Sequence, residues 1–216
     1  ASGELLDEFN RIRDDLVSQI KTDRFDEEKA GKLFGQLAEL PSYLDRATID
    51  VGNGCGKDFE IRYPESVGGD LVAAGKLFPA DTVLPKESLL LDVVQREVGE
   101  GRRVMVHGWH LQLLPRLARL LQERIGEEVP VLYADKVPTT KRQKWIDEKI
   151  VKKKVRVMVC NPVCIQTGLN NLTWFHTIWQ HENPACNPIV DRQSIGRIDR
   201  IGQKKETRVL RAYYGT

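Results

Sequence analysis

Hydrophobic positions in the first 46 residues recur at intervals of three and four, as they do on one face of a helix. Within residues 5–20, the apolar side chains that follow this spacing are Leu5, Leu6, Phe9, Ile12, Leu16 and Ile20. Residues 26–44, DEEKAGKLFGQLAELPSYL, show the same spacing. The pattern therefore predicts two or more amphipathic helices between residues 3 and 46.

Residues 48–85 have a different character and are rich in Gly and Pro, for example VGNGCGKDFEIRYPESVGGD. This composition predicts loops with a short hairpin. The substring GNGCGKD looks like a phosphate-binding loop, but that motif needs four residues between its glycines and Ser or Thr after the Lys. Asp58 follows Lys57 here, so we do not expect a nucleotide-binding loop.

From about residue 86 the pattern alternates between short apolar runs and helical periodicity. The predicted strands are RRVMVHG, VPVLYAD, VRVMVC, WFHTIWQ and ETRVLRAYY. The predicted helices between them are LLPRLARLLQERIG, with Pro115 in its first turn, TTKRQKWIDEKIVKK and a last helix around Gln193. Repeated strand–helix units predict an α/β fold with a parallel sheet covered by helices on both faces. Ligands of such sheets gather at the carboxyl ends of the strands.

The last predicted helix contains QSIGRIDRIGQ, residues 193–203. At about 100° per residue, Gln193, Arg197 and Arg200 form one narrow polar stripe. The isoleucines at 195, 198 and 201 fall on another side, which we expect to pack. Asn187 is a candidate cap, Pro188 suits the first helical position, and Gly202 suits the left-handed residue after the last turn. Two guanidinium groups and an amide would thus face one target, and arginine forks suit phosphate or carboxylate.

Composition places the chain among ordinary globular proteins: 216 residues, 41% hydrophobic and 30% charged. No apolar run approaches the ~18–20 residues of a membrane span, and the start ASGELLDEFN does not read as a signal peptide. The cysteines are Cys55, Cys160, Cys164 and Cys186, without a CxxC pair. We therefore expect a cytoplasmic protein with reduced thiols and no zinc site.

Charge is divided unevenly along the chain. Residues 1–100 contain 12 Lys and Arg against 21 Asp and Glu, whereas residues 101–216 contain 21 against 10. Within residues 136–156, nine basic residues accompany two acids. A basic half predicts a polyanionic partner, most simply nucleic acid, although the lysine run alone is also typical of a solvated helix face.

QSIGRIDRIGQ resembles the final motif of superfamily-two helicases, and its Arg-Ile-Gly-Gln ending resembles the Snf/Swi family of DNA translocases, in its bacterial or phage-type members. RVMVHGWH, YADKVPTTKRQKWIDE and VMVCNPVCIQTGLNNLTWFHTIWQ are similar to other motifs of that family, in the same order. The sequence departs from the family at Ile165 and Gln166, which replace a glycine pair, at the extra Asn171, and at Ala134-Asp135, where a turn glycine is usual.

The resemblance implies a RecA-like C-terminal helicase lobe over residues 86–216 and a helical, loop-rich inter-lobe appendage over residues 1–85. It implies ATP and Mg²⁺ as cofactors, held mainly by an N-terminal RecA-like lobe of the same polypeptide, so that this chain alone is inactive. By motif position, Arg200 is the arginine finger on the γ-phosphate, Arg197 a second phosphate contact, and Gln193 a nucleotide contact. Gly168 and Asn170 lie where the family's motif couples DNA to ATP. No residue here is predicted to bind a metal.

The family also implies sequence-independent contacts to double-stranded DNA from the loops that follow the strands. The candidates are His107, Gly108, Trp109, Lys136, Arg142, Asn161 and Thr167. Core packing of Trp109 and plain hydrogen bonding of His107 are the structural alternatives. Two other functions remain open: a lobe of an RNA or DNA unwinding helicase or restriction-type translocase, and a non-catalytic nucleic-acid-binding or protein-binding domain.

Overall fold

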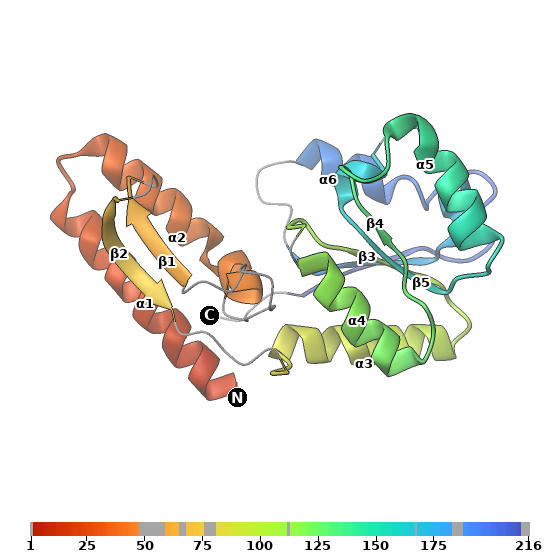
Figure 1. Ribbon diagram of the computed structural model, residues 1–216, viewed down its shortest axis with the longest axis horizontal. Helices are drawn as coiled ribbons and strands as arrows, with labels where there is room; N and C mark the ends of the chain where they lie inside the picture. The colour runs from red at the N-terminus through yellow and green to blue at the C-terminus, as the bar shows by residue number, and fades with distance from the viewer. Residues whose placement is uncertain are drawn as a thin grey trace. The chain divides into compact units, whose positions relative to one another are not determined.

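The computed structural model describes residues 2–47, 59–64, 68–75, 81–111, 113–166, 168–182 and 188–212. The chain divides into two compact units, Ala1–Pro85 and Lys86–Thr216. The helices and strands of both units appear in Figure 1.

The first unit packs a helical hairpin against a β-hairpin. Its elements are α1 (Ser2–Thr22), α2 (Glu27–Ala47), β1 (Phe59–Tyr63) and β2 (Asp70–Gly75), the strands being antiparallel. Asp26 caps α2, since its carboxylate accepts a hydrogen bond from the Lys29 amide at 3.0 Å. The core of the unit consists of Ile12, Leu16, Leu33, Leu40, Ile61 and Ala73. The predicted helices and hairpin are therefore present.

The second unit is built on a five-stranded, all-parallel sheet. Its strands are β3 (Val104–His107), β4 (Val131–Leu132), β5 (Val157–Cys160), β6 (Thr177–Gln180) and β7 (Arg208–Arg211). They lie in the order β4-β5-β3-β6-β7. In the centre, Val104 is opposite Val157 on one side and Thr177 on the other. The carboxyl ends of β3, β5 and β6 therefore meet at one edge.

Helices cover both faces of this sheet (Figure 1). They are α3 (Pro85–Gly99), α4 (Leu113–Ile125), α5 (Thr139–Ile146), the π-helical η1 (Asp147–Val151) and α6 (Pro188–Ile195), with 3-10 turns η2 (Pro162–Cys164) and η3 (Asn171–Trp174). Because strand side chains alternate in direction, Val104 and Val106 pack with α3 and α4, whereas Met105 packs with α5 and η1. The predicted α/β architecture is confirmed.

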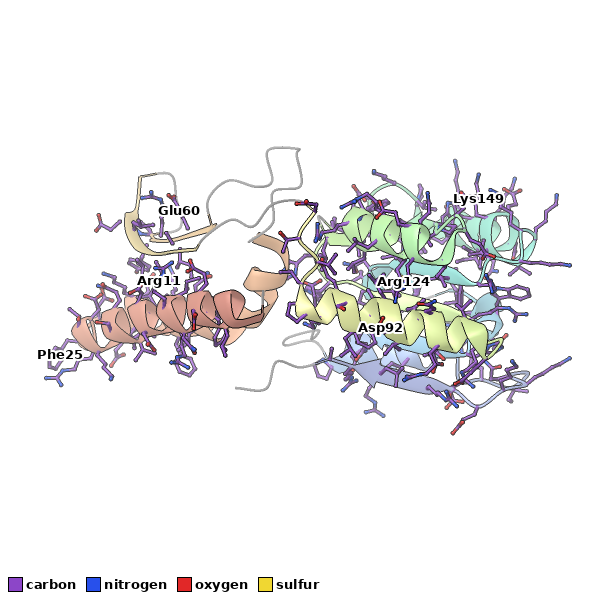
Figure 2. All side chains as sticks on the ribbon, turned by 90° about the horizontal axis from the view of Figure 1, so that it is seen from below. Arg11, Phe25, Glu60, Asp92, Arg124 and Lys149 are labelled. Carbon is purple, nitrogen blue, oxygen red and sulfur yellow. The ribbon has the colours of Figure 1, made fainter. Side chains whose placement is uncertain are left out.

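An exposed ion pair joins the two helices of the first face. Arg124 of α4 donates to Asp92 of α3 at 2.7 Å, and Figure 2 shows the two side chains between these helices. A second, buried pair also joins these helices, because Arg116 donates to both carboxylate oxygens of Glu87 at 2.6 and 2.8 Å.

A buried polar network closes the amino-terminal edge of the sheet. Glu97 is 1% exposed and accepts hydrogen bonds from Arg102 at 2.9 Å, Thr177 at 2.5 Å and Arg208 at 3.0 Å. Burial alone would raise the pKa of Glu97, but these hydrogen bonds and the two arginine charges lower it. This edge is therefore occupied by the protein's own side chains, which leaves the opposite edge for function.

The last helix is shorter than predicted, and this corrects the proposed polar stripe. α6 ends at Ile195, and tighter 3-10-type bonds follow it, from Arg197 N to Ser194 O and from Ile198 N to Ile195 O, both at 3.2 Å. Gly196 has weak helical propensity, and Ile198 turns inward to become fully buried. Ile201, expected to pack, is instead fully exposed.

Three residues were predicted to mark the ends of this helix. Pro188 is its first residue, as expected. Asn187, the proposed cap, lies outside the described residues. Gly202 has a positive φ of 101°, but it serves a β-turn closed from Gln203 N to Arg200 O at 2.9 Å rather than a helix end.

Candidate functional site

Glu182 organises the loop that follows β3. It lies just beyond β6, and its carboxylate accepts from the amides of Trp109 at 2.6 Å and His110 at 2.9 Å, and contacts the His110 ring nitrogen Nδ1. Burial alone would raise the pKa of Glu182, but the hydrogen bonds and charge of His110 hold it below its usual value. The group is thus a buried carboxylate that fixes two successive amides.

Asn161 holds the same loop from the other neighbouring strand. Its side-chain amide donates to the Trp109 carbonyl at 2.6 Å, and its side-chain oxygen accepts from Val163 N at 2.9 Å to cap η2. Asn161 is only 7% exposed. The structure therefore brings the predicted Trp109 and Asn161 together, but Asn161 acts on the backbone of its own chain.

His107 and Gly108 lie inside the unit rather than at its surface. His107 is 3% exposed, neither ring nitrogen has a partner among the described residues, and burial lowers its pKa to about 3. A Cβ on Gly108 would lie 2.5 Å from Leu114 Cδ2, so a larger residue would require the buried Leu114 side chain of α4 to shift. This placement does not support direct DNA contact by either residue; Trp109 is half-buried beside them.

Arg142 is also buried, although it was predicted to contact DNA. It is 7% exposed and donates to the carbonyls of Val137 at 3.0 Å, Ala134 at 3.1 Å and Cys164 at 3.2 Å. Those bonds tie the turn after β4 to the turn after β5. Because its donors are used on backbone oxygens, Arg142 shapes the edge rather than presenting a charge to a ligand.

Three of the predicted residues remain accessible at this edge. Lys136 is exposed, with its ammonium group 4.3 Å from the centroid of the Tyr133 ring. Gly168 is exposed with φ of 73°, and Asn170 is exposed with its backbone N–H donating to Gln143 Oε1 at 2.9 Å. Thr167 lies outside the described residues.

Arg197 is anchored on the loop that carries Gly168. Its Nε donates to the Gln166 carbonyl at 3.1 Å, Nη2 reaches the same oxygen, and Nη1 lies 3.5 Å from the Leu169 carbonyl. Burial and the nearby positive charge of Arg200 lower the pKa of Arg197. The side chain therefore links the segment after α6 to the loop after β5.

Arg200 contrasts with its neighbour. It is exposed, and only its Nε is bonded, to the Gly196 carbonyl at 3.1 Å. Within the described part of the chain, its two terminal nitrogens have no hydrogen-bond partner. Gln193 is likewise exposed on α6. The two arginines are thus close in space, one anchored and one with an open fork.

Gln203 is a structural residue that sequence reasoning missed. Its side-chain amide donates to the carbonyls of Phe175 at 2.8 Å, Ile198 at 3.0 Å and Thr173 at 3.1 Å. Its side-chain oxygen accepts from the amides of the next two residues at 2.9 and 3.2 Å. The final Gly-Gln of the motif therefore holds the Arg200 turn against η3. Glu182 was missed too, although an acid directly after a buried strand is a usable signal.

The remaining chemistry of the described residues is sparse. Cys160 and Cys164 are free and buried, and burial raises the pKa of both, that of Cys164 to about 11, so neither is a reactive thiolate. Cys55 and Cys186 lie outside the described part. Where the structure describes the chain, no three His, Cys, Asp or Glu side chains gather as a metal site, and no helix could cross a membrane.

Comparison with known proteins identifies the fold. No family model and no curated protein matches the chain. Among solved structures, it is similar to the C-terminal part of the Fun30 ATPase domain, with a TM-score of 0.51 and 21% identity over 58% of this chain. It is also similar to the Sulfolobus solfataricus SWI2/SNF2 ATPase core in complex with dsDNA, with a TM-score of 0.59 and 16% identity over 97% of this chain. The chain spans 39% and 38% of these two structures, and its fold is RecA-like, as predicted.

Proposed function

We propose that this chain is the second motor lobe of an ATP-dependent double-stranded DNA translocase of the Snf/Swi helicase-like type. In this proposal Arg200 is the arginine finger that reaches the γ-phosphate of ATP held by a partner RecA-like lobe. The observation that carries the proposal is the pairing of an anchored Arg197 with an exposed Arg200 whose terminal nitrogens are free among the described residues.

The local geometry suits a finger. The bond from Arg200 Nε to the Gly196 carbonyl fixes the root of the guanidinium and leaves its two terminal nitrogens for a phosphate. The adjacent Arg197 adds positive charge, and its bonds to Gln166 and Leu169 couple this position to the loop carrying Gly168 and Asn170. A finger of this kind is worth ~10³–10⁵ in turnover when the lobes close.

ATP is the substrate in this proposal, and its cofactor Mg²⁺ would be held chiefly by the partner lobe. In that division, this chain would contribute guanidinium groups to the phosphates. Mg²⁺ neutralises charge on the phosphates. This chain contributes Arg200, Arg197 and the accessible Gln193, so the 216-residue chain alone should show no turnover.

Of the proposed DNA contacts, Lys136 is accessible at the carboxyl edge and Thr167 lies between the described segments, while the exposed Gly168 and Asn170 would couple DNA to ATP. The similarity to an ATPase core in complex with dsDNA supports DNA as the polymer. His107, Gly108, Arg142 and Asn161 act by positioning these loops, and Glu182 joins them in that role.

The experiment is ATP turnover by a polypeptide that carries this chain together with a phosphate-loop lobe, measured with duplex DNA, single-stranded DNA and RNA. We expect stimulation by duplex DNA of any sequence. Stimulation by RNA or single strands alone would replace this proposal with an unwinding helicase. Absence of turnover with every polymer would leave a non-catalytic binding domain.

A further inference from the structure

The basic stretch 136–156 is not uniform, and the structure separates its nine basic residues by their surroundings. Arg142 is buried on carbonyl groups. Three others form ion pairs: Lys144 with Glu148 at 3.8 Å, Lys153 with Glu128 at 3.0 Å, and Arg156 with Glu127 at 2.6 Å. Lys136 lies over the Tyr133 ring. These five are accounted for by the fold or by the edge already described.

Four lysines remain, and we name them the free-lysine surface: Lys141, Lys149, Lys152 and Lys154. All four are exposed, and no acidic group in the described part of the chain lies within ion-pair distance of them. Lys141 lies on α5, Lys149 lies on η1, and Lys152 directly follows η1. Figure 2 shows Lys149 pointing outward from this helix.

Lys154 is held in a backbone conformation that normally belongs to glycine. Its φ is 55°, and the amides of Lys154 and Val155 bond back to Val151 O at 3.1 Å and Ile150 O at 3.0 Å, closing the helix end. α4 also ends at a residue of positive φ, Gly126 at 70°, whose amide bonds back to Gln122 O at 2.9 Å. For folding alone, glycine would suit this position better than lysine.

The surface has the chemistry of a phosphate contact rather than of a protein or lipid contact. No large hydrophobic residue is exposed within 136–156, where every position is described, whereas protein interfaces and membrane-bound helices need an apolar centre. From Thr139 to Val151 the helix is about 20 Å long, the axial rise of about six base pairs. Unpaired ammonium groups along that length are typical of backbone binding without sequence readout.

We propose that the free-lysine surface binds the phosphate backbone of duplex DNA, as a contact separate from the strand-end loops. The inference rests on the proposed function insofar as the chain binds duplex DNA. Its contacts are electrostatic, so each lysine that meets a phosphate contributes about 0.9 to the slope of log affinity against log salt concentration.

The test is fluorescence anisotropy with a 30-base-pair duplex between 50 and 200 mM KCl, using the 216-residue chain. The double variant Lys149→Gln/Lys152→Gln should lower the salt slope by about 1.8, which makes the affinity loss over this range about 12-fold smaller. The matched control is Lys144→Gln/Lys153→Gln, which removes the same charge from ion-paired positions of the same segment. It should change the slope by less than about 0.5.

The variant Lys154→Gly should be at least as stable as the wild type, so loss of folding would not explain weaker DNA binding. It should raise the melting temperature, because it relieves the positive φ, while lowering the salt slope by about 0.9. Equal slopes for the test and control variants would overturn the inference. Weakened binding to vesicles of 30% phosphatidylserine, with duplex binding intact, would overturn it in favour of a membrane.

Failure of this inference can be told apart from failure of the proposed function. If turnover of the two-lobed polypeptide is stimulated by duplex DNA but the lysine variants bind the duplex like the wild type, only the inference fails. If the wild-type chain does not bind the duplex at 50 mM KCl, the inference fails, and the stimulation assay decides the proposed function independently.

Discussion

Lowering the pH from 7.5 to 5.5 should destabilise the unit that carries the parallel sheet, because two histidines are buried in neutral form. His107 and His181 are 3% and 0% exposed, and burial lowers the pKa of each to about 3. An unfolded chain titrates its imidazoles near 6.5, so between these values it binds more protons than the folded chain. These histidines therefore leave the free energy of unfolding unchanged above pH 6.5, and they lower it as the pH falls below 6.5.

The magnitude follows from the size of the pKa difference. At pH 5.5, one unit below the unfolded pKa, each histidine lowers the free energy of unfolding by about 1.4 kcal/mol, or about 3 kcal/mol for the two. His176, whose pKa burial lowers to about 4, acts in the same direction. Glu97 and Glu182 have lowered pKa values, so they lose their contribution only below about pH 4.5. The chosen pH range therefore isolates the histidines.

The assay is urea unfolding followed by tryptophan fluorescence. The tryptophans of the chain are Trp109, Trp145, Trp174 and Trp179, so the signal reports on residues 86–216 alone. His107→Leu should reduce the pH-dependent loss by about 1.4 kcal/mol, since one titrating group is removed. Equal free energies of unfolding at pH 7.5 and 5.5 in the wild type would refute the reasoning.

Two further substitutions test the local geometry. Lys154→Gly should stabilise the chain by about 0.5–1 kcal/mol in the same urea titration, because glycine adopts a positive φ without steric cost; a loss of stability would contradict the assigned helix end. Gln203→Ala should cost about 1–3 kcal/mol, because three carbonyls lose their donor, and Gln203→Glu should cost more, because it faces those carbonyls with a carboxylate. If the Gln203→Glu variant is as stable as the wild type, the hydrogen bonds assigned to the Gln203 side-chain amide are wrong.

Periodicity was sufficient to predict the architecture of this chain. Apolar runs such as VRVMVC predicted strands whose side chains are buried on both faces of a sheet. In the structure, Val157 and Val159 pack in the hydrophobic cluster on one face, and Met158 packs in the cluster on the other. The parallel direction of the strands, which brings the carboxyl ends of β3, β5 and β6 to one edge, followed from the repeated strand–helix units, whereas the strand order was known only from the structure.

Local propensity failed where tertiary contacts outweigh it. The predicted polar stripe in QSIGRIDRIGQ assumed a continuous helix. In the structure the helix ends at Ile195, Ile198 is buried, and Arg197 donates to the Gln166 carbonyl. Polar residues at strand ends were expected to face a ligand. Asn161 and Arg142 instead satisfy backbone groups of the loops themselves, and periodicity carries no signal for that choice.

The most direct test of the central claim is the turnover of a two-lobed polypeptide containing this chain when Arg200 is replaced. With saturating ATP and duplex DNA, Arg200→Ala should lower turnover by ~10³–10⁵ while ATP binding persists. Arg192→Ala, which removes the same charge from an exposed position of α6, should leave turnover within about twofold, since surface charges away from the reacting phosphate have small effects. Turnover of the Arg200→Ala variant within tenfold of the wild type would contradict the account.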